Sequence, residues 1–187
     1  MILFLIIIYT ILFAAETLLN LSFWFRFKHV KLLGKDDLPN VTVLVCARDE
    51  ENNLRDCLQS LTATDYPINK IEVLIGDDNS EDGTPSIIKE FETKFKFMTG
   101  YNIQHEKDGL IAKANVLSQL IDQSSFQYQV IIDADMVVTP EWLRFMVSAL
   151  VRGNDMVSGY TQVQRSNWLA NLQFMDWQTV LHSMKSM

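Results

Sequence analysis

The sequence predicts an α/β fold with a mainly parallel sheet flanked by helices. Segments rich in β-branched residues alternate along the chain with segments whose apolar residues recur at helical spacing. One acidic stretch, at 77–82, directly follows such a strand segment, and another, at 133–135, closes a later one. Because ligands of parallel sheets bind at the carboxyl ends of the strands, the same pattern also predicts where the functional site lies.

The composition excludes one class of partner and limits the role of the cysteines. The 187 residues carry a formal net charge of −7, and 48% of them are hydrophobic. Nucleic-acid binders normally present a basic face, so nucleic acid is not an expected partner. Cys46 and Cys57 have neither the number of a disulfide framework nor the spacing of metal ligands. We expect both to be reduced residues of the core.

The first residues predict a single transmembrane helix over 1–25. This segment contains one charged residue, Glu16, and a helix of this length crosses a hydrocarbon core of about 30 Å. A secretory signal peptide is the alternative, but here the basic residues follow the apolar run instead of preceding it. The lysines and arginine at 26–40 predict a basic juxtamembrane linker. They also place the rest of the chain on the cytoplasmic side of the inner or plasma membrane.

Strand and helix signals alternate after this linker. Val41–Ala47 is a run rich in β-branched residues, as expected for a strand buried on both faces. Apolar residues at helical spacing from Leu54 to Leu61 predict the helix that follows. A second strand is expected over Ile71–Gly76, and Pro85 suits the first turn of the next helix.

The remaining segments continue the alternation. Strands are expected at 97–104, 128–135 and 155–164, and helices at 112–121, from 139, and from 167 onward. Thr139 is the expected N-cap of the second of these helices, and Gly153 lies near its expected C-terminus. The alternation predicts one α/β domain over 41–187.

The D-x-D pair formed by Asp133 and Asp135 is a candidate metal site. The two residues lie two positions apart on an expected strand, so their side chains point the same way. Two carboxylates suit one Mg²⁺ or Mn²⁺ ion, with substrate phosphates and water completing the octahedron. The alternative is an ordinary turn with two exposed carboxylates.

The stretch DDNSEDGT, at 77–84, crowds four carboxylates into six positions. Asp, Asn, Ser and Gly are common turn formers, so the stretch taken alone also fits a plain turn capped by Ser80 or Thr84. Like charges this close cost free energy unless cations or hydrogen-bond donors lie among them. Since both acidic stretches lie at carboxyl ends of strands, we expect them to meet at one edge of the sheet.

Four segments together resemble family 2 glycosyltransferases of the GT-A fold. They are VTVLVCARDEENNLRDCLQSL (41–61), YPINKIEVLIGDDNSEDGT (66–84), KANVL (113–117) and VIIDADMVVTPEWL (130–143). The resemblance extends roughly from Val41 to Gln164. It implies a GT-A catalytic domain that is incomplete at its C-terminus and, with the predicted span, attached to a membrane.

The resemblance implies a role for each matching residue. Nucleotide-sugar binding is implied for Ala47, Arg48, Glu50, Asp77, Asp78, Lys113 and Asp133. A divalent ion, Mg²⁺ or Mn²⁺, is implied at Asp135, with Asp133 touching the ion or the ribose. The catalytic base of this family belongs to a later motif, so we expect it beyond Met187.

The implied reaction moves a sugar from a nucleotide-diphosphate donor, with UDP as the default, to a hydroxyl of a sugar or lipid-linked acceptor. Negative charge develops on the leaving diphosphate, and a divalent ion and a lysine stabilise it. An inverting displacement also needs a base. We therefore expect the donor-binding half of an enzyme of cell-envelope polysaccharide or glycolipid synthesis, inactive alone. A nucleotidyltransferase and a non-catalytic, membrane-tethered interaction domain are the alternatives.

Overall fold

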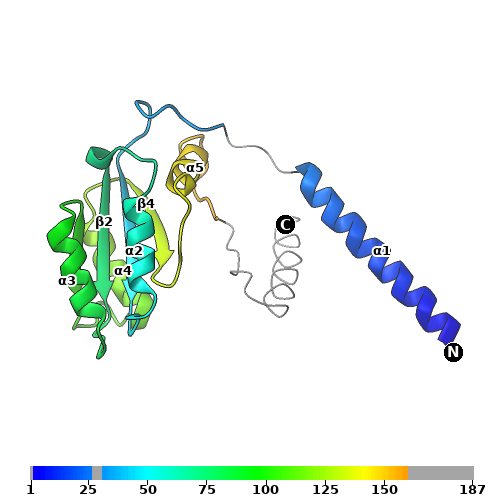
Figure 1. Ribbon diagram of the computed structural model, residues 1–187, viewed down its shortest axis with the longest axis horizontal. Coiled ribbons are helices and arrows are strands. Elements are labelled where there is room, and N and C mark those ends of the chain that lie inside the picture. Colours follow the sequence, from blue (N-terminus) through cyan, green and yellow to red (C-terminus); the bar gives the residue numbers. More distant parts are fainter. Residues whose placement is uncertain (1, 27–30, 160–187) are drawn as a thin grey trace. The chain divides into compact units, whose positions relative to one another are not determined.

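The structure, a computed structural model, describes residues 2–26 and 31–159 (Figure 1). The chain separates into two compact units. One contains helix α1 (Ile2–Arg26), and the other is the α/β unit over Val30–Ser158. All the predicted site residues belong to the α/β unit.

A four-stranded parallel sheet forms the centre of the α/β unit. Its strands are β1 (Val41–Ala47), β2 (Ile71–Asp77), β3 (Met98–Asn102) and β4 (Tyr128–Asp133), in the order β3-β2-β1-β4. All neighbouring strands run parallel, and the register sets Ala47 beside Asp77 and Cys46 beside Asp133. The carboxyl ends of β1, β2 and β4 therefore meet at one edge, as predicted.

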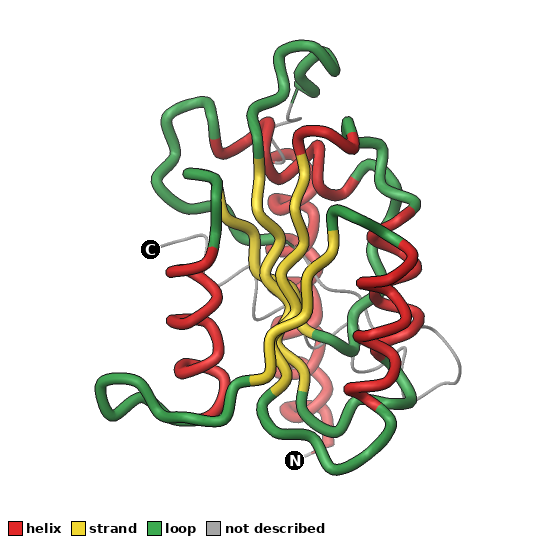
Figure 2. The backbone as a smooth tube through the Cα atoms, turned by 90° about the vertical axis from the view of Figure 1, so that its left-hand side faces the viewer, coloured by secondary structure: helices red, strands yellow, loops and turns green. Residues whose placement is uncertain are grey.

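Helices cover both faces of this sheet (Figure 2). The helices are α2 (Leu54–Thr62), α3 (Thr84–Lys94), α4 (Ala112–Gln123) and α5 (Trp142–Leu150), with a short 3₁₀ turn η1 (Ile68–Lys70) before β2. Apolar residues of α2, α3 and α5 pack with Val43 and Val45 on one face. Val116 and Leu120 of α4 pack with Leu44 on the other face. The alternation of side chains along β1 thus supplies both cores.

Two predicted boundaries near the end of the sheet differ from the structure. β4 ends at Asp133 and not at Asp135, because the backbone N–H of Met136 donates to the carbonyl of Asp133 at 3.1 Å and closes a turn. α5 begins at Trp142 with Glu141 as its N-cap, so Thr139 is not the N-cap.

The predicted elements beyond α5 are described only in part. The segment 155–159 is not a strand in the structure. The rest of the strand predicted at 155–164, and the helix predicted from 167, lie outside the described residues.

The segment before β1, predicted as a linker, packs onto the α/β unit. Arg144 of α5 donates from Nε and Nη2 to the carbonyl of Leu33 at 3.0 and 2.7 Å. The backbone N–H of Leu33 in turn donates to Ser148 Oγ at 3.0 Å. Leu38 is buried in the core, and Lys70 Nζ donates to its carbonyl at 2.8 Å. From Leu33 onward this segment is therefore fixed to the sheet and α5.

Helix α1 covers the segment predicted to span a membrane. Its described apolar side chains, among them Phe4, Ile11 and Leu18, are exposed. Across residues 2–26 and 31–159, however, no helix combines the length and apolar character needed to cross a membrane. The transmembrane helix over 1–25 stays a prediction.

Candidate functional site

The loops after β1 and β2 bring three predicted nucleotide-binding residues together at the carboxyl edge of the sheet. The backbone N–H of Asp78 donates to the carbonyl of Ala47 at 2.9 Å. Arg48 Nη1 lies 3.3 Å from Asp78 Oδ2, with 64% of the Arg48 side chain and 17% of the Asp78 side chain exposed. The pair offers a guanidinium and a carboxylate to solvent at this edge.

Lys113 and Asp133 form an ion pair at the same edge. Lys113 lies in the first turn of α4, and its Nζ contacts Asp133 Oδ1 at the end of β4. About half of each side chain is exposed. Two residues predicted from separate motifs, 20 positions apart, are thus in direct contact.

Asp133 and Asp135 lie at exposed positions at the end of β4 and in the turn after it. The two aspartates are exposed, whereas Ala134 between them is buried. Oxygen donors of this kind are the ones that Mg²⁺ and Mn²⁺ prefer. The described residues contain no group of three or more His, Cys, Asp or Glu placed to hold a metal. Asp133 and Asp135 thus supply two of the carboxylate groups that such an ion could use.

The two thiols lie close to these carboxylates. The pKa of Cys46 is raised to about 11, mainly by burial; Lys113 opposes this rise, and Asp133 and Asp78 contribute to it. Burial, followed by the charge of Asp135, raises the pKa of Cys57 to about 12. Both cysteines are free, as predicted, although Cys46 is only partly buried.

These raised values predict slow thiol chemistry. At pH 8 a thiol with a pKa of about 11 has a thiolate fraction about 100-fold below that of an ordinary cysteine. We expect both thiols to react with iodoacetamide at least that much more slowly in the native protein than after unfolding in urea. Mass spectrometry of the labelled cysteines measures this. Rapid native labelling of Cys57 at pH 8 would contradict the packing of α2 against the sheet.

Hydrogen-bond donors explain how the stretch 77–84 tolerates its carboxylates. Asp77 is 4% exposed, and its Oδ1 accepts from the backbone N–H and the hydroxyl of Ser80 at 3.1 and 2.5 Å. Asp82 accepts from the backbone N–H groups of Glu51 and Thr84 at 3.0 and 2.9 Å. Asp77 therefore shapes the loop from within, whereas Asp78 presents its carboxylate to Arg48.

Glu50, the remaining predicted nucleotide-binding residue, lies on the loop after β1. Its carboxylate accepts from Asn53 Nδ2 at 2.8 Å, and its backbone N–H donates to Thr84 Oγ1 at 2.8 Å. The side chain is partly buried. These two contacts stabilise the start of α2 and the neighbouring loop.

The sequence prediction missed Asn115, which fixes the loop between β3 and α4. Asn115 is buried; its Oδ1 accepts from the backbone N–H of Lys107 at 2.9 Å and its Nδ2 donates to the carbonyl of His105 at 3.0 Å. This loop leads directly to Lys113. The available signal was an amide side chain on the otherwise apolar, sheet-facing side of a helix.

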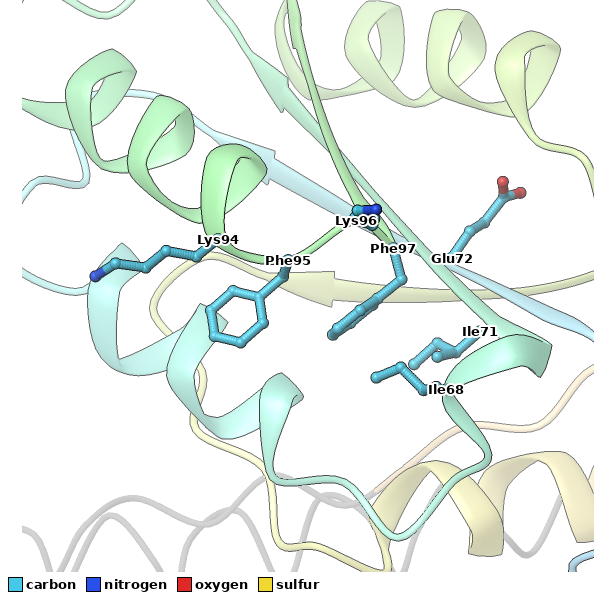
Figure 3. A pocket seen from close by; sticks show the side chains of 7 residues that line it. All are labelled: Ile68, Ile71, Glu72, Lys94, Phe95, Lys96 and Phe97. Atoms are coloured by element: carbon cyan, nitrogen blue, oxygen red, sulfur yellow. The ribbon is translucent and has the colours of Figure 1, made fainter.

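A pocket of about 520 Å³ lies at the opposite, amino edge of the sheet and contains none of the predicted site residues (Figure 3). Figure 3 shows the rings of Phe95 and Phe97 near each other, with the Glu72 carboxylate pointing away from them. Glu72 accepts from Thr42 and Ser125, so its carboxylate serves the packing of the strands. The groups suited to chemistry lie at the carboxyl edge.

Comparison with known proteins identifies a family. The family model for Glycosyl transferase family 2 matches residues 42–183, more than half of the chain. Glycosyltransferase AglE of Haloferax volcanii is 33% identical over 131 residues, which cover 70% of this chain and 42% of that protein. Poly-beta-1,6-N-acetyl-D-glucosamine synthase of Staphylococcus epidermidis is 26% identical over 153 residues, 79% of this chain and 35% of that protein.

Solved structures show the same architecture. Mannosyltransferase PcManGT from Pyrobaculum calidifontis, in complex with GDP-Man and Mn²⁺, aligns with a TM-score of 0.56 at 25% identity, covering 75% of this chain and 42% of that one. TarS of S. aureus, in complex with UDP-GlcNAc, has a TM-score of 0.51 at 18% identity, covering 67% of this chain and 38% of that one. This chain spans about two fifths of the length of these relatives. The predicted GT-A fold is confirmed, and the chain belongs to Glycosyl transferase family 2.

Proposed function

We propose that this chain binds the nucleoside-diphosphate donor for the transfer of a sugar to an acceptor hydroxyl, with Mg²⁺ or Mn²⁺ at Asp135 and Asp133. The convergence of four separate segments carries the proposal. Arg48 and Asp78 follow β1 and β2, Lys113 lies on α4, and the two aspartates lie at the end of β4 and in the turn after it, all at one edge of the sheet. Such an edge is where parallel sheets bind ligands.

The groups at this edge match the parts of the proposed donor. The Asp78 carboxylate and the Arg48 guanidinium supply an acceptor and donors for the nucleoside, next to the backbone of Ala47. Lys113 brings a positive charge to the position where the diphosphate would lie. The divalent ion would neutralise negative charge on the departing diphosphate. Lys113 then supplies the protein's own stabilisation of that charge.

The relatives support a nucleotide-sugar donor. One similar structure contains GDP-Man and another contains UDP-GlcNAc. For this chain we propose UDP as the default nucleotide and a sugar or lipid-linked acceptor, in the synthesis of cell-envelope polysaccharide or glycolipid. Attachment to the inner or plasma membrane, with the α/β unit in the cytoplasm, belongs to the same proposal. The family match gives no support to nucleotidyl transfer.

Calorimetric titration of the protein with UDP and with GDP, with and without Mn²⁺, tests the proposal. We expect one of these nucleotides to bind, and Mn²⁺ to lower its dissociation constant about tenfold or more. Release of the same nucleotide from its sugar conjugate, measured with candidate acceptors, tests the transfer step. If neither UDP nor GDP binds in the presence of Mn²⁺ or Mg²⁺, the proposed function is wrong.

A further inference from the structure

The loops after β1 and β2 are joined by an interloop clasp, formed by residues 49–51 and 80–84. Successive backbone N–H groups of the first loop each donate to a side chain of the second. These bonds run from Asp49 to Ser80 Oγ at 2.9 Å, from Glu50 to Thr84 Oγ1 at 2.8 Å, and from Glu51 to Asp82 Oδ2 at 3.0 Å. The side chains of the second loop thus supply hydrogen-bond acceptors for the backbone N–H groups of the first. These N–H groups need such acceptors because they have no partners within a helix or strand.

Bonds in the reverse direction make the interloop clasp reciprocal. The backbone N–H of Glu81 donates to Asp49 Oδ1 at 2.9 Å, and that of Gly83 donates to Glu51 Oε2 at 2.8 Å. Bonds from N–H groups to an ionised carboxylate are stronger than neutral ones. Asp49 and Glu51 therefore have backbone partners within the interloop clasp.

Asp82, the third carboxylate of the interloop clasp, is held in its ionised form. Partial desolvation is the largest single influence and raises its pKa. The hydrogen bonds from Thr84 and from the backbone of Glu51 together outweigh desolvation, so the pKa of Asp82 lies below its usual value. An ionised Asp82 keeps its acceptor capacity at neutral pH.

The interloop clasp begins one residue after Arg48 and two residues after Asp78. Asp49 follows Arg48 with a φ of 52°, and Asn79 follows Asp78 with a φ of 56°. Asp and Asn are the non-glycine residues that adopt this left-handed region most readily, so both turns are compatible with their sequence. The interloop clasp fixes these turns on both sides of the Arg48–Asp78 contact, because Asp49 and Ser80 bond to the opposite loop.

We propose that Asp49 is a positioning residue for nucleotide binding. Its backbone N–H and its carboxylate bind the second loop at two adjacent points, Ser80 and Glu81. These contacts orient the turn that aims Arg48 at Asp78. This inference rests on the proposed function, because the Arg48–Asp78 pair is the part of the site assigned to the nucleoside. Asp49 itself touches no part of the donor in this scheme.

The effect of Asp49 on nucleotide binding is measured with three variants. Asp49→Ala removes the acceptor for the Glu81 N–H, and we expect it to raise the dissociation constant for UDP or GDP about tenfold. Asp49→Asn keeps an oxygen acceptor and tolerates a positive φ, so we expect affinity within about threefold of wild type. Glu81→Ala is the matched control, because the described residues show no hydrogen bond to the Glu81 carboxylate. We expect it to bind as wild type does.

Titration of the same variants with Mn²⁺ alone separates positioning from general damage. Asp133 and Asp135 lie on β4 and its turn, so Asp49→Ala should leave Mn²⁺ affinity unchanged while nucleotide affinity falls. Equal nucleotide binding by Asp49→Ala and wild type would overturn the inference and leave the proposed function standing. Equal losses of nucleotide and Mn²⁺ affinity, or no recovery in Asp49→Asn, would also overturn it. Failure of wild type to bind either nucleotide would overturn the proposed function and this inference together.

Discussion

Replacing Asp135 with asparagine is expected to remove the Mn²⁺ dependence of nucleotide binding, so that UDP or GDP binds equally well with and without Mn²⁺. Asp135 is exposed on the turn after β4 and carries the negative charge that the proposed ion needs. An amide of the same shape keeps the turn but removes that charge, so the change tests the charge and not the packing. Titration with Mn²⁺, followed by electron paramagnetic resonance of the free ion, measures the loss of metal binding directly.

Two comparisons keep this result interpretable. Asp36→Asn removes an exposed aspartate from the segment before β1, and it should leave both Mn²⁺ binding and the Mn²⁺ dependence of nucleotide binding unchanged. We expect wild type to bind nucleotide more tightly with Mn²⁺ than without it. If the Asp135→Asn variant does the same, the assignment of Asp135 to the metal is wrong.

Replacing Gly76 with alanine is expected to destabilise the α/β unit by about 1–3 kcal/mol. Gly76 lies on β2 where α4 crosses the sheet, and a Cβ there would lie inside contact distance of Val116 Cγ1 and 3.2 Å from Leu120 Cδ1. Val116 is β-branched and stiff in a helix, so it cannot easily turn aside. Urea unfolding followed by circular dichroism measures the change in the free energy of unfolding.

A double-mutant cycle with Val116→Ala identifies the clash as the cause. Val116→Ala removes the methyl group that the new Cβ meets. The double variant should therefore lose less stability than the sum of the two single variants. Simple additivity would show that Gly76→Ala acts through β2 alone and that α4 does not pack as closely as the structure shows.

Most of the fold could be predicted from the sequence because its strand segments show clear runs of apolar and β-branched residues. Val41–Ala47 is predicted with the bounds of β1, and Ile71–Gly76 falls one residue short of β2. Buried parallel strands give continuous apolar runs that propensity alone identifies. The predicted end of β4 was wrong because a single backbone hydrogen bond, from Met136 to Asp133, ends the strand. No pattern of side chains in the sequence indicates that bond.

The sequence predicted which edge of the sheet holds the candidate site, but not which side chains contact one another there. The contact between Lys113 and Asp133 depends on the strand order, which places β4 beside β1. This order cannot be predicted from local sequence patterns. The interloop clasp was missed for another reason. Its donors are backbone amides, which every residue carries, so only the folded loops reveal which carboxylate accepts from which amide.

A crystal structure of the protein with Mn²⁺ and the nucleotide that it binds is the most direct measurement of the donor site. We expect the ion to lie between Asp135 and the diphosphate oxygens, and the nucleoside to contact Arg48 and Asp78. A diphosphate bound away from the carboxyl edge, for example in the pocket beside Phe95 and Phe97, would contradict the assignment.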